Sequence, residues 1–261
     1  MQKRQIILVT SLLFVWTNCS NNQLEEKGFR VNNSTKIENS ETEKVEGISK
    51  DSVKLKTQPS NVLLTGISNV RLTTLYKVNV NKRDATTFIG SNAFLYNNAE
   101  LEQGNDWNGH LVPGLEGVYG YNLVNVSHYD MLTTKKKDLF EKAVLIKTLY
   151  YPSSSKDTLN KKVVKRNYIL VSVYDDDTNK DSFINQKDLR RFYLFDSSGN
   201  KQKQIIPENY SVFKSEYDSE NDVMFVFARA DTNSNGQAES SEPVSIFWVD
   251  LKDPMRTGQQ Y

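Results

Sequence analysis

Cysteine and histidine are almost missing from this sequence. It has one cysteine and two histidines among 261 residues. A single cysteine cannot form a disulfide within the chain, and it excludes the cysteine-rich class of zinc site. Two isolated histidines leave little material for a histidine-based metal centre or for a Ser-His-Asp catalytic triad.

An excess of charge of either sign is also missing. The chain has 33 Lys and Arg residues against 32 Asp and Glu residues, a formal net charge of +1. Proteins that hold nucleic acid by its phosphates need clustered positive charge, so we expect no nucleic-acid partner. The sequence also lacks the Gly-x-Ser-x-Gly, P-loop, His-Glu-x-x-His and dinucleotide-binding motifs. No catalytic residues are indicated.

The only long apolar run lies at the amino terminus. Lys3 and Arg4 precede eleven mostly apolar residues, 6–16. A helix of eleven residues is too short to cross a hydrocarbon core of about 30 Å. A charged segment followed by such a run is typical of a secretory signal peptide.

The one cysteine, Cys19, comes just after this run. Its position resembles the lipobox of bacterial lipoproteins, whose cysteine is lipidated and becomes the first mature residue. The resemblance implies a signal peptide over residues 1–18, secretion across the inner membrane, and a lipid anchor at Cys19. The protein would then lie in the cell envelope, anchored to the outer membrane on its periplasmic or surface face. Residues 16–18 (Trp-Thr-Asn) depart from the usual pattern, so a secretory signal with an incidental cysteine is the alternative.

A polar segment follows at residues 19–60. In residues 20–60, 26 of 41 positions are Asn, Ser, Thr, Lys or Glu. Such a segment cannot bury enough apolar surface to offset the entropy lost on ordering. We therefore expect a disordered tether, followed by a globular domain over residues 61–261.

The domain has the pattern of an all-β fold. Short aromatic and β-branched runs alternate with turn-rich polar segments, and no helical period of useful length appears. The strands we expect lie at residues 70–78, 119–126, 143–150, 168–174, 191–195, 210–217, 223–229 and 244–249.

An internal repeat refines this expectation. Residues 168–196 align without a gap with residues 222–250, and each copy has a strand, a polar loop and a second aromatic strand. Repeated β-units of about 50 residues resemble the blades of a propeller. We therefore predict propeller-like tandem four-stranded antiparallel sheets, three or four in number, with a β-sandwich as the alternative. Residues 204–206 and 210–217 would supply the first two strands of the last sheet. Residues 121–130, followed by 133–137 and 139–140, would form the tail of an earlier unit.

The polar loop of each repeat has oxygen-bearing side chains at fixed positions. Counting from Asp177 and from Asp231, acidic or amide side chains occupy positions 1, 3, 5, 9 and 12, and position 7 supplies a main-chain carbonyl. Counting from Asp175 instead would place Gln186 at position 12, where a carboxylate is needed. The predicted ligands are Asp177, Asn179, Asp181, Phe183, Asn185 and Asp188 in the first loop, and Asp231, Asn233, Asn235, Gln237, Glu239 and Glu242 in the second.

This spacing resembles the calcium loop of EF-hands, and the first copy is similar to the loops of dockerin modules. Ca²⁺ takes six to eight oxygen ligands at about 2.3–2.6 Å, which alternate residues of a tight loop can supply. Ser182 replaces the usual glycine at position 6 of the first loop, and Ala238 the usual larger aliphatic residue at position 8 of the second. Because strands flank both loops, we expect two structural calcium ions rather than a helix-opening sensor. Ordinary strand-connecting loops without metal are the alternative.

These features together predict a calcium-binding envelope lipoprotein that acts as an interaction module for a protein or a glycan. An envelope or secreted hydrolase on the same scaffold is the second hypothesis. It would need two carboxylates in one cleft, for which Asp130 and Glu141 are candidates. An architectural envelope subunit is the third, and it would be marked by a large exposed aromatic patch.

Overall fold

The computed structural model describes residues 29–30, 56–80, 87–89, 93–94, 112–119 and 122–261. Every regular element in these residues is a β-strand, so the predicted all-β class is confirmed. The predicted signal peptide, Cys19 and most of the expected tether lie outside the described residues. The part of the chain that is described contains no helix long and apolar enough to cross a membrane.

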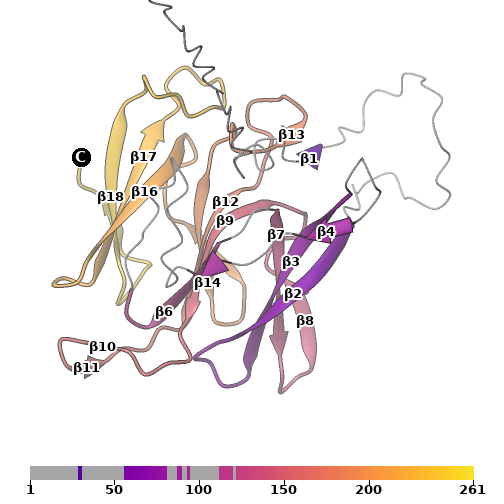
Figure 1. The fold of residues 1–261 in the computed structure, drawn as a ribbon. Coiled ribbons are helices and arrows are strands. Elements are labelled where there is room, and N and C mark those ends of the chain that lie inside the picture. Colours follow the sequence, from indigo (N-terminus) through magenta and orange to yellow (C-terminus); the bar gives the residue numbers. More distant parts are fainter. Residues whose placement is uncertain (1–28, 31–55, 81–86, 90–92, 95–111, 120–121) are drawn as a thin grey trace, which may run out of the picture.

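The described residues of the domain form three antiparallel sheets of four or more strands (Figure 1). The first sheet has the order β2 (Thr57–Leu64), β3 (Val70–Val80), β7 (Leu123–Asp130) and β8 (Lys135–Asp138), with β4 (Thr87–Ile89) paired to β3. The second has the order β15 (Lys201–Gln204), β14 (Arg191–Asp196), β12 (Tyr168–Tyr174), β9 (Leu145–Pro152), β6 (Leu115–Tyr119) and β5 (Ala93–Phe94). The third has the order β16 (Tyr210–Asp218), β17 (Val223–Ala230), β18 (Val244–Asp250) and β19 (Thr257–Gln259).

Two short ladders lie outside these sheets. One pairs β10 (Thr158–Leu159) with β11 (Lys162–Val163). The other pairs β1 (Phe29–Arg30) with β13 (Phe183–Ile184), far apart in the sequence. Together with the start of β2 at Thr57, β1 places strand structure inside the range expected for the tether.

Each of the three sheets contains the same four-stranded meander. The strands follow one another as β2-β3-β7-β8, as β9-β12-β14-β15 and as β16-β17-β18-β19. The predicted tandem antiparallel sheets are therefore present. The two copies of the repeat cover the second and third strands of the second and third meanders. The expected tail of an earlier unit is present as β7 and β8, the third and fourth strands of the first meander, and residues 139–140 lie beyond β8.

The prediction that residues 204–206 form the first strand of the last sheet is wrong. Gln204 ends β15, the outermost strand of the second sheet, while Ile205 and Ile206 are buried between the second and third sheets. The third sheet begins with β16 instead, and its fourth strand, β19, was not expected. Edge strands such as β15 and β19 are polar and have no fully buried residue, so they lack the apolar alternation that marks the central strands.

The second sheet lies between the other two. All residues of β9 and of β12 are buried, as expected for strands covered on both faces. Ile169, Val171 and Val173 pack toward the first sheet, whereas Leu170 packs toward the third. Along β17 of the third sheet, buried and half-buried residues alternate, so that sheet contributes one face to the core. The result is a stack of blade-like sheets with two apolar interfaces.

An aspartate ends the third strand of each meander. Asp130, Asp196 and Asp250 each accept a hydrogen bond from the main-chain N–H two residues ahead, at 2.9 Å in all three cases. These aspartates cap the turn into the fourth strand.

Candidate calcium loops

The two predicted calcium loops occupy equivalent places in neighbouring sheets. Residues 177–188, here called loop 1, connect β12 to β14, and residues 231–242, here called loop 2, connect β17 to β18. Both therefore join the second and third strands of a meander, and both lie at the same end of the molecule (Figure 1). In the first sheet this place is taken by the long connection that carries β4, β5 and β6.

Loop 1 is organised by its first and last carboxylates. Asp177 accepts hydrogen bonds from the main-chain N–H groups of Asp181 and Ser182, at 3.0 and 2.9 Å. Asp188 accepts hydrogen bonds from the N–H groups of Thr178 and Asn185, at 2.9 and 2.8 Å. The carboxylates at positions 1 and 12 thus hold the main chain at positions 2, 5, 6 and 9.

Loop 2 has the same hydrogen bonds. Asp231 accepts from the N–H groups of positions 5 and 6, at 3.1 and 3.0 Å. Glu242 accepts from those of positions 2 and 9, at 2.9 and 3.1 Å. Phe183 and Gln237, at position 7 of their loops, each donate their N–H to the side chain at position 5, at 2.9 Å. The longer Glu242 therefore does for loop 2 what Asp188 does for loop 1.

The backbone also follows one course in both loops. Positions 4 and 6 are left-handed, with φ of 60° at Lys180 and 70° at Ser182, and of 56° at Ser234 and 74° at Gly236. Ser182 therefore adopts the conformation that position 6 usually assigns to glycine. Because a left-handed residue other than glycine costs roughly 1–2 kcal/mol, loop 1 is strained at this point.

The remaining predicted ligands gather at the centre of each loop. In loop 1 Asp181 accepts hydrogen bonds from the amides of Asn179 and Asn185, at 3.4 and 3.3 Å. In loop 2 Glu239 accepts from the amides at positions 3 and 5, at 3.1 and 3.0 Å. The side chains at positions 3, 5 and 9 are thus close enough to share one ion in each loop.

The position 12 carboxylates are buried without a counter-charge. Asp188 is 0% exposed and Glu242 is 7% exposed. Neither forms an ion pair with a Lys or Arg of the described residues. Burial raises the pKa of Asp188 to about 6, although main-chain hydrogen bonds act in the opposite direction. A buried, ionised carboxylate is unfavourable without a cation beside it, and a bound metal ion would remove that penalty.

The donors in both loops suit a hard cation. They are carboxylate, amide and carbonyl oxygens, which Ca²⁺ prefers, and no cysteine or histidine is among them. Within the described residues no three or more His, Cys, Asp and Glu side chains form a metal-binding group. Each loop would therefore hold an ion only with its amide and main-chain oxygens included, as calcium loops do and zinc sites do not.

The two loops differ in how the residue at position 8 packs against the core. In loop 1, Ile184 at position 8 is 2% exposed and packs with Leu145 and Tyr174. Its neighbour Phe183 is paired with Arg30 of β1. In loop 2 position 8 is Ala238, which is exposed.

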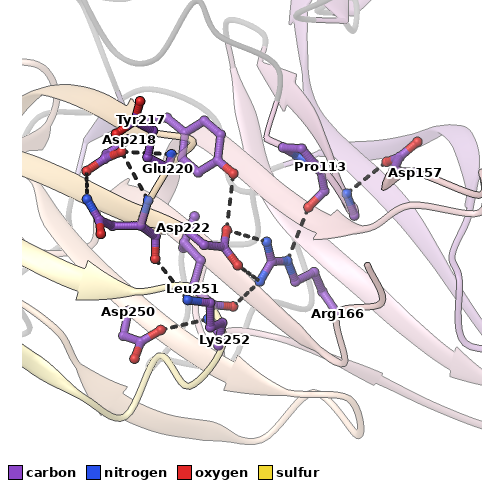
Figure 2. A network of polar contacts seen from close by, with 12 residues as sticks. Pro113, Asp157, Arg166, Tyr217, Asp218, Glu220, Asp222, Asp250, Leu251 and Lys252 are labelled. Atoms are coloured by element: carbon purple, nitrogen blue, oxygen red, sulfur yellow. Dashed lines mark hydrogen bonds and ion pairs between the residues drawn. The ribbon is translucent and has the colours of Figure 1, made fainter. Parts of the chain in front are cut away.

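A second buried polar group lies away from the loops, and nothing in the sequence pointed to it (Figure 2). Arg166 donates hydrogen bonds to both carboxylate oxygens of Asp222, at 3.0 and 2.7 Å, and also to the Leu251 carbonyl. It further contacts the Pro113 carbonyl at 3.2 Å, and the Tyr217 hydroxyl donates to Asp222 at 3.1 Å. Arg166 precedes β12 and Asp222 precedes β17, so the group joins the second and third sheets.

The carboxylates considered for a hydrolase are not brought into one hollow. Asp130 lines a hollow of about 390 Å³ beside β8 and the β14–β15 turn. Glu141 lines a different one of about 770 Å³, together with Asp138 and Asp175.

No protein-family model and no curated protein matches this chain. The interpretation of the loops therefore rests on their own geometry and chemistry.

Proposed function

We propose that this protein is a calcium-binding lipoprotein of the bacterial cell envelope. Its all-β domain would act as an interaction module for a protein or glycan partner, with one structural Ca²⁺ in each of loop 1 and loop 2. One observation carries the calcium proposal. Two loops with different sequences share the same hydrogen bonds and left-handed positions around a buried carboxylate that has no Lys or Arg partner among the described residues.

Within the proposal, the loop residues have distinct tasks. Asp177 and Asp231 would each turn a carboxylate oxygen to the ion while holding positions 5 and 6 by hydrogen bonds. The amides of Asn179 and Asn233 would rotate so that oxygen, not nitrogen, faces the centre. The ion would offset two of the three negative charges of the carboxylates in each loop and so fix the connection between two core strands.

Calcium would act on stability. Sites of the extracellular type bind with affinities of about 10⁻⁴ to 10⁻³ M. An ion at 100 times its dissociation constant stabilises the folded state by about 2.7 kcal/mol per site. The domain would then reach full stability only after it leaves the calcium-poor cytoplasm.

The anchor part of the proposal rests on Cys19, which lies outside the described residues. Its support is the position of the only cysteine directly after the signal-like segment. Mass spectrometry of the purified full chain should find acyl chains on Cys19, and a chain that keeps a free thiol there contradicts the anchor.

A calorimetric titration of the full chain in detergent tests the calcium proposal. We expect two sites in the wild type and one site in each of Asp177→Ala and Asp231→Ala. Asp196→Ala is the matched control, since Asp196 also caps a turn through main-chain N–H groups but lies outside both loops. It should retain both sites. Absence of calcium uptake by the folded wild type would falsify the proposal, and so would an equal loss of sites in Asp196→Ala.

A further inference from the structure

Loop 1 and loop 2 touch each other directly. The Thr178 hydroxyl, at position 2 of loop 1, donates a hydrogen bond of 2.6 Å to the carbonyl of Gly236, at position 6 of loop 2. The same hydroxyl accepts the N–H of Leu189 at 2.8 Å. A Cβ atom on Gly236 would stand only 2.0 Å from the Thr178 carbonyl oxygen. Gly236 is therefore required by this contact as well as by its left-handed backbone.

The contact connects the two sets of predicted ligands. On one side, the Thr178 N–H is hydrogen-bonded to Asp188, the last ligand of loop 1. On the other side, the Gly236 N–H is hydrogen-bonded to Asp231, the first ligand of loop 2, at 3.0 Å. Thr178 and Gly236 are thus each joined by one hydrogen bond to a carboxylate that would bind an ion.

Loop 2 depends on this contact more than loop 1 does. Loop 1 is fixed to the core by Ile184 and to β1 by Phe183. Loop 2 has the exposed Ala238 at the corresponding position, and its buried residue at the turn is Gly236, against Thr178. The conformation of loop 2 therefore depends on its packing against an ordered loop 1.

We propose that calcium binding at the two loops is positively coupled, and that the contact between Thr178 and Gly236 carries the coupling. The inference rests on the calcium proposal made above. An ion in one loop fixes that side of the contact, so the other loop loses less conformational entropy when it binds. By thermodynamic linkage, each ion raises the affinity for the other by the same factor. Direct repulsion between the two divalent ions acts in the opposite sense and is weakened by salt.

The coupling factor can be measured with the full chain at physiological ionic strength. Asp231→Ala gives the affinity of loop 1 alone, and Asp177→Ala gives that of loop 2 alone. Each variant gives the association constant of its one remaining site. The coupling factor is the overall two-site association constant of the wild type divided by the product of these two single-site association constants. We expect a factor of at least about five, within the roughly 5–150-fold range typical of coupled sites.

The same three measurements in a Thr178→Val background test the route. Valine keeps the branched shape but removes the hydroxyl, so both loops should still bind and the factor should fall to about one. Thr178→Ser restores the hydroxyl and should restore the coupling. Near-ultraviolet circular dichroism establishes that each variant is folded. Should Thr178→Val not fold, the serine variant decides the matter: a factor of about five or more supports the route, and a factor near one overturns it.

The outcomes separate the two proposals. A wild type that binds two ions with a factor of one, or a factor that persists in folded Thr178→Val, overturns the coupling and leaves the calcium sites standing. A wild type that binds no calcium overturns both.

Discussion

Arg166 and Asp222 place two opposite charges in the interior between the second and third sheets. Both side chains are 3% exposed. Burial by itself lowers the pKa of Arg166, and the hydrogen bonds and charge of Asp222 more than offset it, so the guanidinium stays charged. Breaking a buried ion pair of this kind strongly destabilises the fold, because removal of one partner leaves the other as a buried, unpaired charge.

We therefore expect Arg166→Leu to lower the free energy of unfolding by about 3–5 kcal/mol in urea denaturation. Arg256→Leu is the control, since Arg256 pairs with Asp250 at 2.8 Å but is 66% exposed. The control should cost less than about 1 kcal/mol. Asp222→Asn in the Arg166→Leu background should recover part of the loss, because it removes the uncompensated charge. Equal costs for the two arginine variants would rule out a special role for the buried pair.

At the scale of single elements, loop 1 has a serine at position 6, where glycine would adopt the left-handed backbone at a lower cost in free energy. Ser182 has a φ of 70°, and its N–H still reaches Asp177. The left-handed conformation costs roughly 1–2 kcal/mol for serine, while glycine adds about 0.5–1 kcal/mol of chain entropy in the unfolded state.

Ser182→Gly should accordingly stabilise the protein by up to about 1 kcal/mol and strengthen calcium binding at loop 1. Thermal unfolding with and without calcium measures both effects. Ser198→Gly provides the comparison, because Ser198 lies in the β14–β15 turn and has no positive φ. This control should lose about 0.5–1 kcal/mol. A loss of stability in Ser182→Gly would show that the strain at position 6 is not real.

The core strands could be predicted from the sequence because their apolar residues are contiguous. β12 has the predicted bounds, Tyr168–Tyr174, since it is buried on both faces. The expected strand at residues 119–126 is instead split between β6 and β7, which belong to different sheets. The polar edge strands β15 and β19 were not predicted. None of their residues is fully buried, so burial does not impose an apolar pattern on their sequences.

The bounds of the two loops could be predicted because the spacing of their oxygen-bearing side chains is a local property of the chain, whereas their binding of calcium stays a prediction. The contact between Thr178 and Gly236 could not, because it joins residues 58 positions apart that meet only when the sheets stack. The pair of Arg166 and Asp222 escaped for the same reason, at a separation of 56. Arg166 lies outside the repeat. Thr178 lies inside it, opposite Thr232, but the repeat does not indicate which residue of the other loop it contacts.

For the whole molecule, calcium should act on two of the three sheets. The connection between second and third strands is a candidate calcium loop in the second and third sheets, whereas in the first sheet it carries β4, β5 and β6. Removal of calcium should therefore loosen the structure unevenly.

Hydrogen exchange measured by mass spectrometry in calcium and in EDTA checks this. We expect faster exchange in EDTA at both loops and at the adjoining ends of β12 and β17, with β2 and β3 unchanged. Asp196→Ala should show the same calcium response as the wild type. A uniform change over all three sheets would mean that the ions stabilise the fold globally instead.

The pairing of β1 with β13 would also limit how far the domain could stand from a membrane to which Cys19 is anchored, as proposed above. Phe29 follows Cys19 by ten residues, which can span at most about 35 Å when fully extended. Without that pairing, the first fixed point would be Thr57 in β2, and the maximum reach from Cys19 would be roughly 130 Å. With Cys19 as the proposed anchor, the two residues of β1 that pair with positions 7 and 8 of loop 1 therefore shorten the maximum reach almost fourfold. They would keep both candidate calcium loops within about one domain diameter of the lipid.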